Sequence, residues 1–265
     1  YWVSVNVSYN QNEIKEKKEA PLKNDYQYEK GHRIGARYMY QFFRFYDEDT
    51  PRLYEETFGE PFPKQLVDLK DGDAVFVDLD HNGIIDDNDK TRAIGYTDDP
   101  EYIAGINCGF SYKDWEFSMQ WTGAWNVSRM IEDVFRIPFK SRTGMSDGGL
   151  LQYHIDHTWS PDNPGQDYDY PRATWANGLN NNYLDCSLYE KDAKYLRLKT
   201  IALAYNFHAD FLKRKLGINN LQIAISGYNL LTFTPFIWGD PETRTSSAPS
   251  YPLQKTYTVS LKLNF

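Results

Sequence analysis

The sequence predicts an all-β protein: a segment of an antiparallel transmembrane β-barrel with long extracellular loops. Three observations support this prediction. Residues 256–265 alternate apolar and polar side chains without a break, over about the length that a tilted strand needs to cross a bilayer. Two other alternating runs are separated by only two residues, as in a tight hairpin. Short and very long connections also take turns along the chain, which is typical of a bacterial outer-membrane barrel.

The composition allows a barrel and argues against several other classes. Mean hydropathy is -0.67 and 41% of residues are hydrophobic, values that a soluble protein would share. A barrel reaches the same values because a spanning strand needs lipid-facing apolar residues only at every second position. No run of about 18 apolar residues is present, which excludes a transmembrane helix. The net charge of -8 argues against a nucleic-acid partner, since phosphate binding needs a basic surface.

The first two predicted strands cover residues 1–10 and 35–45. Residues 1–10 alternate from the first position, so we interpret the chain as a fragment and expect any signal peptide in preceding sequence. Residues 35–45 alternate poorly and are assigned as a crossing strand to complete the set.

A hairpin is predicted next, with arms at residues 102–113 and 115–122 joined by Lys113 and Asp114. One face of both arms is wholly apolar, with aromatic residues near both ends, as the girdles of a membrane barrel require. The opposite face is small and polar, and we expect it to line the interior. Its polar members are Asn107, Ser111, Glu116, Ser118 and Gln120.

The remaining strands are predicted at residues 195–206, 221–233 and 256–265, which gives about seven crossing strands. The short connections are residues 113–114 and 208–220, and the long loops cover about 46–100, 126–192 and 234–253. If the C-terminus is periplasmic, the long loops are extracellular and residue 1 enters from outside. Because about seven strands would make a barrel narrower than the smallest known class, the rest of the wall is expected in preceding sequence.

Two basic residues interrupt this pattern. Counting every second residue in 195–206 puts Arg197 and Lys199 on the apolar side of their strand, near its outer end. We expect their long side chains to reach the lipid headgroups there.

An acidic loop, residues 78–89, carries the clearest chemistry. It matches the calcium loop of an EF-hand, with carboxylates at the first and third positions, an amide at the fifth and Gly83 at the sixth. The expected ligands are Asp78, Asp80, Asn82, the backbone carbonyl of Ile84, Asp86 and Asp89. Asp89 stands where a bidentate Glu is usual, which should weaken or reshape the site. The alternative is a solvated acidic turn, because Asp and Asn tolerate tight backbone.

Three ordered blocks of the sequence resemble the distal part of SusC-like TonB-dependent transporters. They are the acidic loop with Ile94 and Gly95, the hairpin around Lys113 and Asp114, and the ending, which includes residues 195–206, 226–233, 239–242 and 251–265. The resemblance covers roughly residues 72–125 and 193–265. It implies that residues 1–265 are the C-terminal portion of a 22-stranded barrel, plugged by a domain absent from this chain.

The resemblance also implies a function and partners. The whole protein would import oligosaccharides through the bacterial outer membrane together with a SusD-like surface lipoprotein, energised by the TonB–ExbB–ExbD complex. The remainder of the same barrel and the membrane lipid are the other expected partners. Oligopeptide is the alternative cargo. No catalytic residue is assigned, and an enzyme is not expected.

Aromatic residues among polar ones in the 126–192 loop are candidates for cargo contact, since such rings stack on sugars while polar neighbours bond the hydroxyls. The candidates are Trp159, Tyr168, Tyr170, Trp175 and Tyr183. Alternatively, these rings pack the loop on itself or against the lipoprotein. His154 and His157 flank Asp156 without a third convergent ligand, so we interpret them as ordinary polar groups of the loop.

A soluble all-β domain that binds or cleaves glycans is the competing interpretation. Its strands would face a sandwich core on one side and water on the other. Such a domain should turn roughly every 8 to 12 residues, a rhythm that the long loops replace here.

Overall fold

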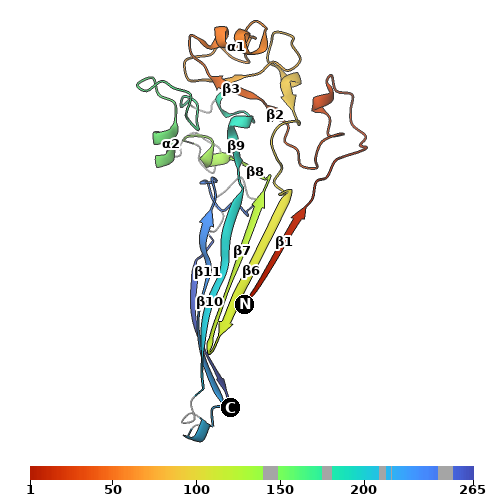
Figure 1. Ribbon diagram of the computed structural model, residues 1–265. Coiled ribbons are helices and arrows are strands. Elements are labelled where there is room, and N and C mark those ends of the chain that lie inside the picture. Colours follow the sequence, from red (N-terminus) through yellow and green to blue (C-terminus); the bar gives the residue numbers. More distant parts are fainter. Residues whose placement is uncertain (140–148, 175–180, 209–212, 216, 244–252) are drawn as a thin grey trace.

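The computed structural model describes residues 1–265 except 140–148, 175–180, 209–212, 216 and 244–252. Its largest element is a six-stranded antiparallel sheet. In spatial order its strands are β1 (Trp2–Tyr9), β6 (Tyr102–Tyr112), β7 (Trp115–Trp125), β10 (Tyr195–Phe207), β11 (Asn220–Phe233) and β12 (Thr256–Asn264). Figure 1 shows them as long neighbouring ribbons below a broad region of loops. The predicted antiparallel sheet with long loops at one end is therefore present.

The hairpin of β6 and β7 has the predicted register. Tyr112 pairs with Trp115, so that Lys113 and Asp114 alone form the turn. Lys113 has a φ of 53, the left-handed conformation that two-residue hairpin turns require. Residues opposite one another share a face of the sheet. The pairs Asn107 with Gln120, Gly109 with Ser118 and Ser111 with Glu116 therefore place the expected interior residues together.

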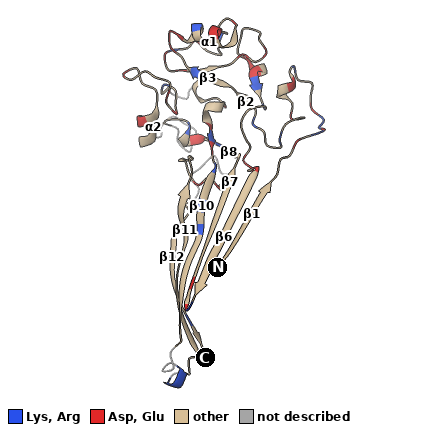
Figure 2. Cartoon of the chain, in the orientation of Figure 1, with Lys and Arg blue, Asp and Glu red and all other residues tan. Residues whose placement is uncertain are grey.

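The other face of the sheet is apolar and exposed. On the edge strands, Val3 is 68% exposed, Val259 75% and Leu261 63%. A sandwich would cover such side chains with a second sheet. Among the described residues the other sheets have only two strands each, and they lie among the loops, so the sandwich interpretation is wrong. Figure 2 shows most of the strand length free of charged residues, which gather in the loops and near the opposite turns.

Two predictions about the strands are wrong. Residues 35–45 do not cross with the sheet but form β2 (Met39–Tyr40) and β3 (Phe42–Phe45) among the loops. Met39, Tyr40 and Phe45 are at most 2% exposed, because their apolar side chains enter a separate core. The described part of the chain thus has six crossing strands instead of about seven. The direction of the first strand also differs from the prediction. β1 runs from the side of the short turns up to the loops, whereas residue 1 was expected on the outer side.

The loops at the upper end fold together into a region that we call the cap, made of the described parts of residues 10–101, 126–194 and 234–243. Its regular elements are α1 (Thr50–Phe58), α2 (Gln152–His157) and three small sheets that pair β2 with β5 (Lys90–Thr91), β3 with β4 (Ala74–Phe76) and β8 (Ser128–Met130) with β9 (Glu190–Asp192). Single 3-10 turns complete it: η1 (Asp25–Gln27), η2 (Asp87–Asp89), η3 (Asp133–Phe135), η4 (Asn181–Tyr183) and η5 (Ser187–Tyr189). At the other end of the sheet, residues 213–215 are helical, within the short connection at residues 208–220.

The longer helix of the cap has ordinary end signals. Pro51 lies in the first turn of α1, and Gly59, with a φ of 75, ends it. Among the described residues, no helix is long and apolar enough to span a membrane.

The cap has its own hydrophobic core. Its most buried members include Met39, Tyr40, Phe76, Cys186 and Tyr189, each at most 2% exposed. The rings of Tyr40 and Phe76 stack with their centroids 4.7 Å apart. Phe236, which follows β11, joins the same cluster. All three long connections therefore contribute side chains to one core, and this burial gives them a fixed fold.

Candidate metal centre and outer loops

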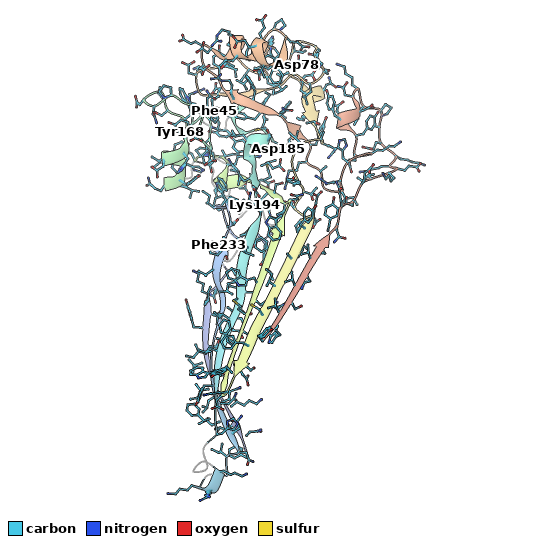
Figure 3. All side chains as sticks on the ribbon, viewed as in Figure 1. Phe45, Asp78, Tyr168, Asp185, Lys194 and Phe233 are labelled. Carbon is cyan, nitrogen blue, oxygen red and sulfur yellow. The ribbon has the colours of Figure 1, made fainter. Side chains whose placement is uncertain are left out.

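The acidic loop lies in the cap, directly after the buried strand β4 (Asp78 is labelled in Figure 3). Asp78 is 4% exposed, and its backbone N–H donates to the Tyr54 hydroxyl at 3.0 Å. Its carboxylate accepts hydrogen bonds from the backbone N–H groups of Asn82 at 3.3 Å and Gly83 at 2.7 Å. Gly83 has a φ of +82, which favours glycine. Asp78, the first expected ligand, therefore stabilises the predicted turn of the loop through these backbone hydrogen bonds.

Asp89, at the other end of the loop, is fully buried. Its Oδ1 accepts from the N–H of Leu79 at 2.8 Å, and its Oδ2 accepts from the N–H of Asp86 at 2.7 Å. Burial raises the pKa of Asp89, although the backbone donors act to lower it. Its carboxylate therefore ties the end of the loop back to its beginning.

Asp78, Asp80 and Asp89 converge. Each brings one carboxylate oxygen within 4.8 Å of the other two, and they form the one group of this kind in the described part of the chain. Calcium ligands lie about 2.3–2.6 Å from the ion, so oxygens on opposite sides of one ion are roughly 4.6–5.2 Å apart. The spacing fits a single hard cation.

Asp80 gives an independent indication of a cation. Its side chain is 2% exposed, and its Oδ1 has no hydrogen-bond partner among the described residues. Its Oδ2 pairs with the ammonium of Lys23. Burial acts to raise the pKa of Asp80, but Lys23 and the donors of Asn82 bring that pKa below its ordinary value. A buried carboxylate oxygen without a partner is costly, and a bound cation would remove that cost.

The other three expected ligands take part in the turns of the loop. Asn82 Oδ1 accepts from the N–H of Ile84 at 2.9 Å, and Asp86 Oδ1 accepts from the N–H of Asn88 at 2.6 Å. Asp86 thereby caps η2, and Ile84 pairs with Lys64 in an isolated bridge. Asn82, Ile84 and Asp86 stay predicted ligands.

The five aromatic candidates for cargo contact lie in different environments. Three of them are buried: Trp159 is 6% exposed, Tyr170 1% and Tyr183 9%. They pack within the cap, which matches the alternative that the sequence left open. Tyr168 is partly exposed, and its hydroxyl donates to the Asn163 carbonyl at 2.7 Å. Trp175 lies outside the described residues.

The two loop histidines are packing groups. His154 is 1% exposed, its Nε2 lies 3.0 Å from the Phe135 carbonyl oxygen, and its ring meets Tyr170 edge-on. Burial lowers the pKa of His154. His157 stacks on Tyr153 with the ring centroids 3.7 Å apart.

Arg197 does not face lipid, so that prediction is wrong. A β-bulge between Leu198 and Thr200 shifts the alternation by one residue, and Arg197 pairs with Thr122 on the polar face. Its side chain is 2% exposed, and one terminal nitrogen bonds both carboxylate oxygens of Asp240 at 2.9 Å.

Glu242 completes this ion-pair group. It lies 2.5 Å from Arg197 and 2.7 Å from Lys199, which is likewise directed toward an acidic partner and not toward headgroups. The group fastens the connection that follows β11 to the outer end of the sheet. The local sequence showed the charges but not the bulge that turns them inward.

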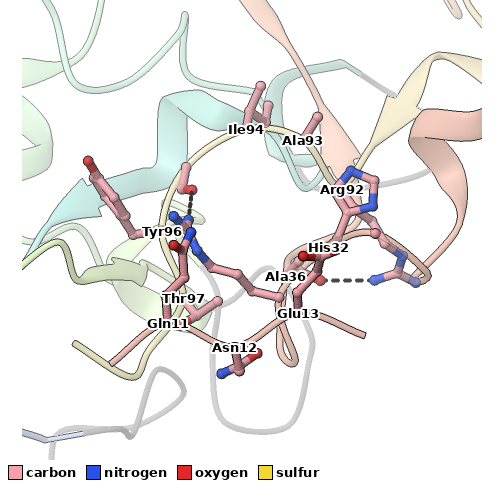
Figure 4. Close-up of a pocket in the computed structure, with 13 residues that line it drawn as sticks. Gln11, Asn12, Glu13, His32, Ala36, Arg92, Ala93, Ile94, Tyr96 and Thr97 are labelled. Carbon is pink, nitrogen blue, oxygen red and sulfur yellow. Dashed lines mark hydrogen bonds between the residues drawn. The ribbon is translucent and has the colours of Figure 1, made fainter. Parts of the chain in front are cut away.

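A pocket of about 360 Å³ lies where the chain leaves β1 and enters the cap. Figure 4 shows its wall, in which Arg92 donates to the Ala36 carbonyl at 2.9 Å. Arg33, also in the wall, pairs with Glu101 at 2.5 Å. Since both guanidinium groups hold cap segments together, we assign this pocket no ligand.

Curated relatives of the chain are named as TonB-dependent receptors. The chain is 27% identical over 238 residues to the TonB-dependent receptor P3 of Formosa agariphila, a match that covers 83% of this chain and 22% of the receptor. It is also 27% identical over 207 residues to the TonB-dependent receptor P26 of the same organism, covering 73% of this chain and 20% of that receptor. The chain therefore spans about a fifth of the length of the curated relatives it matches. No protein-family model matches the chain.

Solved structures share the fold. The RagAB peptide importer in its 'open-open' state matches with a TM-score of 0.69 at 19% identity, over 99% of this chain and 26% of that chain. The 'closed-closed' state matches with a TM-score of 0.68 at 20% identity, over 99% of this chain and 27% of that chain.

The two-faced sheet and these matches define the class: a segment of an outer-membrane β-barrel. Within that class, the resemblance to SusC-like TonB-dependent transporters that the sequence indicated is confirmed. The matched relatives are receptors and transporters, not enzymes.

Proposed function

We propose that the whole protein imports an oligomeric nutrient across the outer membrane, driven by the TonB–ExbB–ExbD complex. The observation that carries this proposal is the sheet with two different faces. One face exposes large apolar side chains such as Val259, suited to lipid, and the other carries small polar ones such as Ser118 and Gln120, suited to a watery passage. The names of the relatives support the same conclusion. This chain would supply part of the wall and the cap.

A SusD-like surface lipoprotein is the partner that we propose for the cap. Because the cap has a core of its own, it offers a fixed surface at the outer end of the barrel. Purifying the full-length protein from its native membrane should bring such a lipoprotein with it. A full-length protein that is consistently purified without one would argue against this partner.

The proposed cargo is an oligosaccharide, and an oligopeptide is the second candidate. The family resemblance favours glycan, whereas the structural neighbours carry the name peptide importer. The burial of Trp159, Tyr170 and Tyr183 removes three of the rings that suggested sugar stacking. Native mass spectrometry of the full-length complex, incubated with matched mixtures of oligosaccharides and oligopeptides, separates the two. Retention of peptides alone would overturn the glycan proposal.

We further propose that the acidic loop binds calcium through Asp78, Asp80 and Asp89, with Asn82, Ile84 and Asp86 completing the shell. The convergent oxygens and the unpartnered Oδ1 of Asp80 support this proposal. Asp80→Ala in the full-length protein should weaken calcium binding at least about tenfold, because ligand charge sets affinity in such loops. Asp162→Ala, an exposed change elsewhere in the cap, is the control. Identical calcium titrations of wild type and Asp80→Ala would remove the site.

A further inference from the structure

We propose that Lys23 is a built-in counterion of the acidic loop, which calcium displaces when it binds. This inference rests on the proposed calcium site and adds a competitor to it. Lys23 comes from the segment between β1 and β2, and its ammonium pairs with the Oδ2 of Asp80, a side chain that is 2% exposed. The ammonium therefore occupies one of the two carboxylate oxygens of Asp80, and its positive charge would repel a metal ion that approaches the same carboxylate.

The charge of Lys23 acts on the whole carboxylate cluster. It interacts electrostatically with Asp86 and Asp89 as well as with Asp80. Without a metal ion, three carboxylates within 4.8 Å would repel one another, and the ammonium offsets part of that repulsion. With calcium bound, two cations would compete for Asp80. Since the side chain of Lys23 is 53% exposed, it can turn into water when the divalent ion takes its place.

Uncharged hydrogen bonds hold the rest of the Lys23 segment against the loop. The Tyr26 hydroxyl donates to the Asn88 carbonyl at 2.8 Å, and Gln27 Nε2 donates to the Asp87 carbonyl at 3.3 Å. These bonds go to backbone carbonyls and do not depend on the carboxylates. Calcium would therefore release the Lys23 side chain while η1 stays docked beside η2.

The consequence for affinity distinguishes a competitor from a structural support. A support should weaken calcium binding when it is removed, whereas a competitor should strengthen it. We expect Lys23→Gln to lower the calcium dissociation constant about tenfold. The effect is modest because the Lys23 side chain is 53% exposed, so that water screens its charge.

Calcium titration of the full-length protein in detergent, by isothermal calorimetry, tests this inference. The matched control is Lys17→Gln, which removes the same charge from the same segment, where Lys17 pairs with Glu29. Its calcium affinity should equal that of the wild type. In parallel, trypsin should cut after Lys23 faster when calcium is added, while cutting after Lys17 should keep its rate.

The outcomes separate the two proposals. If the wild type binds calcium and Lys23→Gln binds it with equal or weaker affinity, Lys23 is no competitor and the calcium site stands. If the wild type binds no calcium at all, the proposed site fails, and the role of Lys23 fails with it.

Discussion

The sheet and the cap treat their apolar side chains in opposite ways. In the sheet, Val259 and Leu261 are more than 60% exposed, on a face that no second sheet of the described residues covers. In the cap, Met39 and Phe76 are completely buried in a shared core. One chain thus folds against two solvents. The sheet needs a lipid environment to complete its burial, whereas the cap completes its own and can face water.

Charged groups gather where these two regions meet. Arg197 joins the outer end of β10 to Asp240, and on the other side of the junction Glu190 accepts from Arg37 at 2.9 Å. Glu190 sits so close to Gly95 that a Cβ there would lie 1.9 Å from its carboxylate. Polar contacts therefore fix the cap to the outer end of the sheet.

One of the two largest expected effects comes from breaking that junction. Arg197→Met should destabilise the outer end of the sheet by about 2–3 kcal/mol, because it removes a buried guanidinium and leaves the partly buried carboxylates of Asp240 and Glu242 without it. Hydrogen exchange of residues 234–243 in the full-length protein should rise strongly. Lys199→Met removes a more exposed charge and should cost less than about 1 kcal/mol. Equal effects of the two variants would contradict the role given to Arg197.

A second effect of similar size should separate the two exposed apolar surfaces. Val259→Arg places a charge midway along β12, on the lipid face, and should cost about 2–4 kcal/mol when the barrel is unfolded with urea from a bilayer. Ile155→Arg changes a side chain of α2 in the cap that is 59% exposed, and should cost less than about 0.5 kcal/mol. If both variants cost the same, the sheet and the cap would share one solvent.

The smallest effect is a pH dependence confined to the cap. Burial lowers the pKa of His154 below the 6.5 of an unfolded histidine, so the folded state takes up this proton less readily. The stability of the cap around His154 is therefore full above pH 6.5 and falls as the pH drops below it, by no more than about 1.4 kcal/mol per pH unit. Protection factors from hydrogen exchange of α2, compared above and below that pH, measure this loss. His154→Gln should abolish it, and a persistent loss in that variant would assign it to another group.

The sheet was largely predictable from the sequence because apolar and polar residues alternate along each strand, a pattern that a short stretch of sequence is enough to show. The hairpin of β6 and β7, with its turn at Lys113 and Asp114, follows from alternation alone. The prediction for residues 35–45 was wrong because strands of two to four residues that pack into a core are too short to show a period. The prediction for Arg197 was wrong because a single bulge exchanges the two faces of the strand for every residue on one side of the bulge.

The candidate metal centre divides in the same way. Asp78, Asp80 and Asp89 lie within one short loop, so their spacing predicts their convergence. Lys23 lies 57 residues before Asp80, and only the folded cap brings the two together. The burial of Trp159 and Tyr170 was also beyond reach, because an aromatic residue in a polar loop looks the same whether it faces a ligand or a core.

The shared core of the cap has a consequence for engineering. Met39 and Phe76 come from the first long connection, Tyr189 from the second and Phe236 from the third. In a chimaera that takes one connection from a relative, the new side chains would have to pack against two connections with which they do not fit. Swapping specificity between such proteins calls for transplanting the three connections as a set.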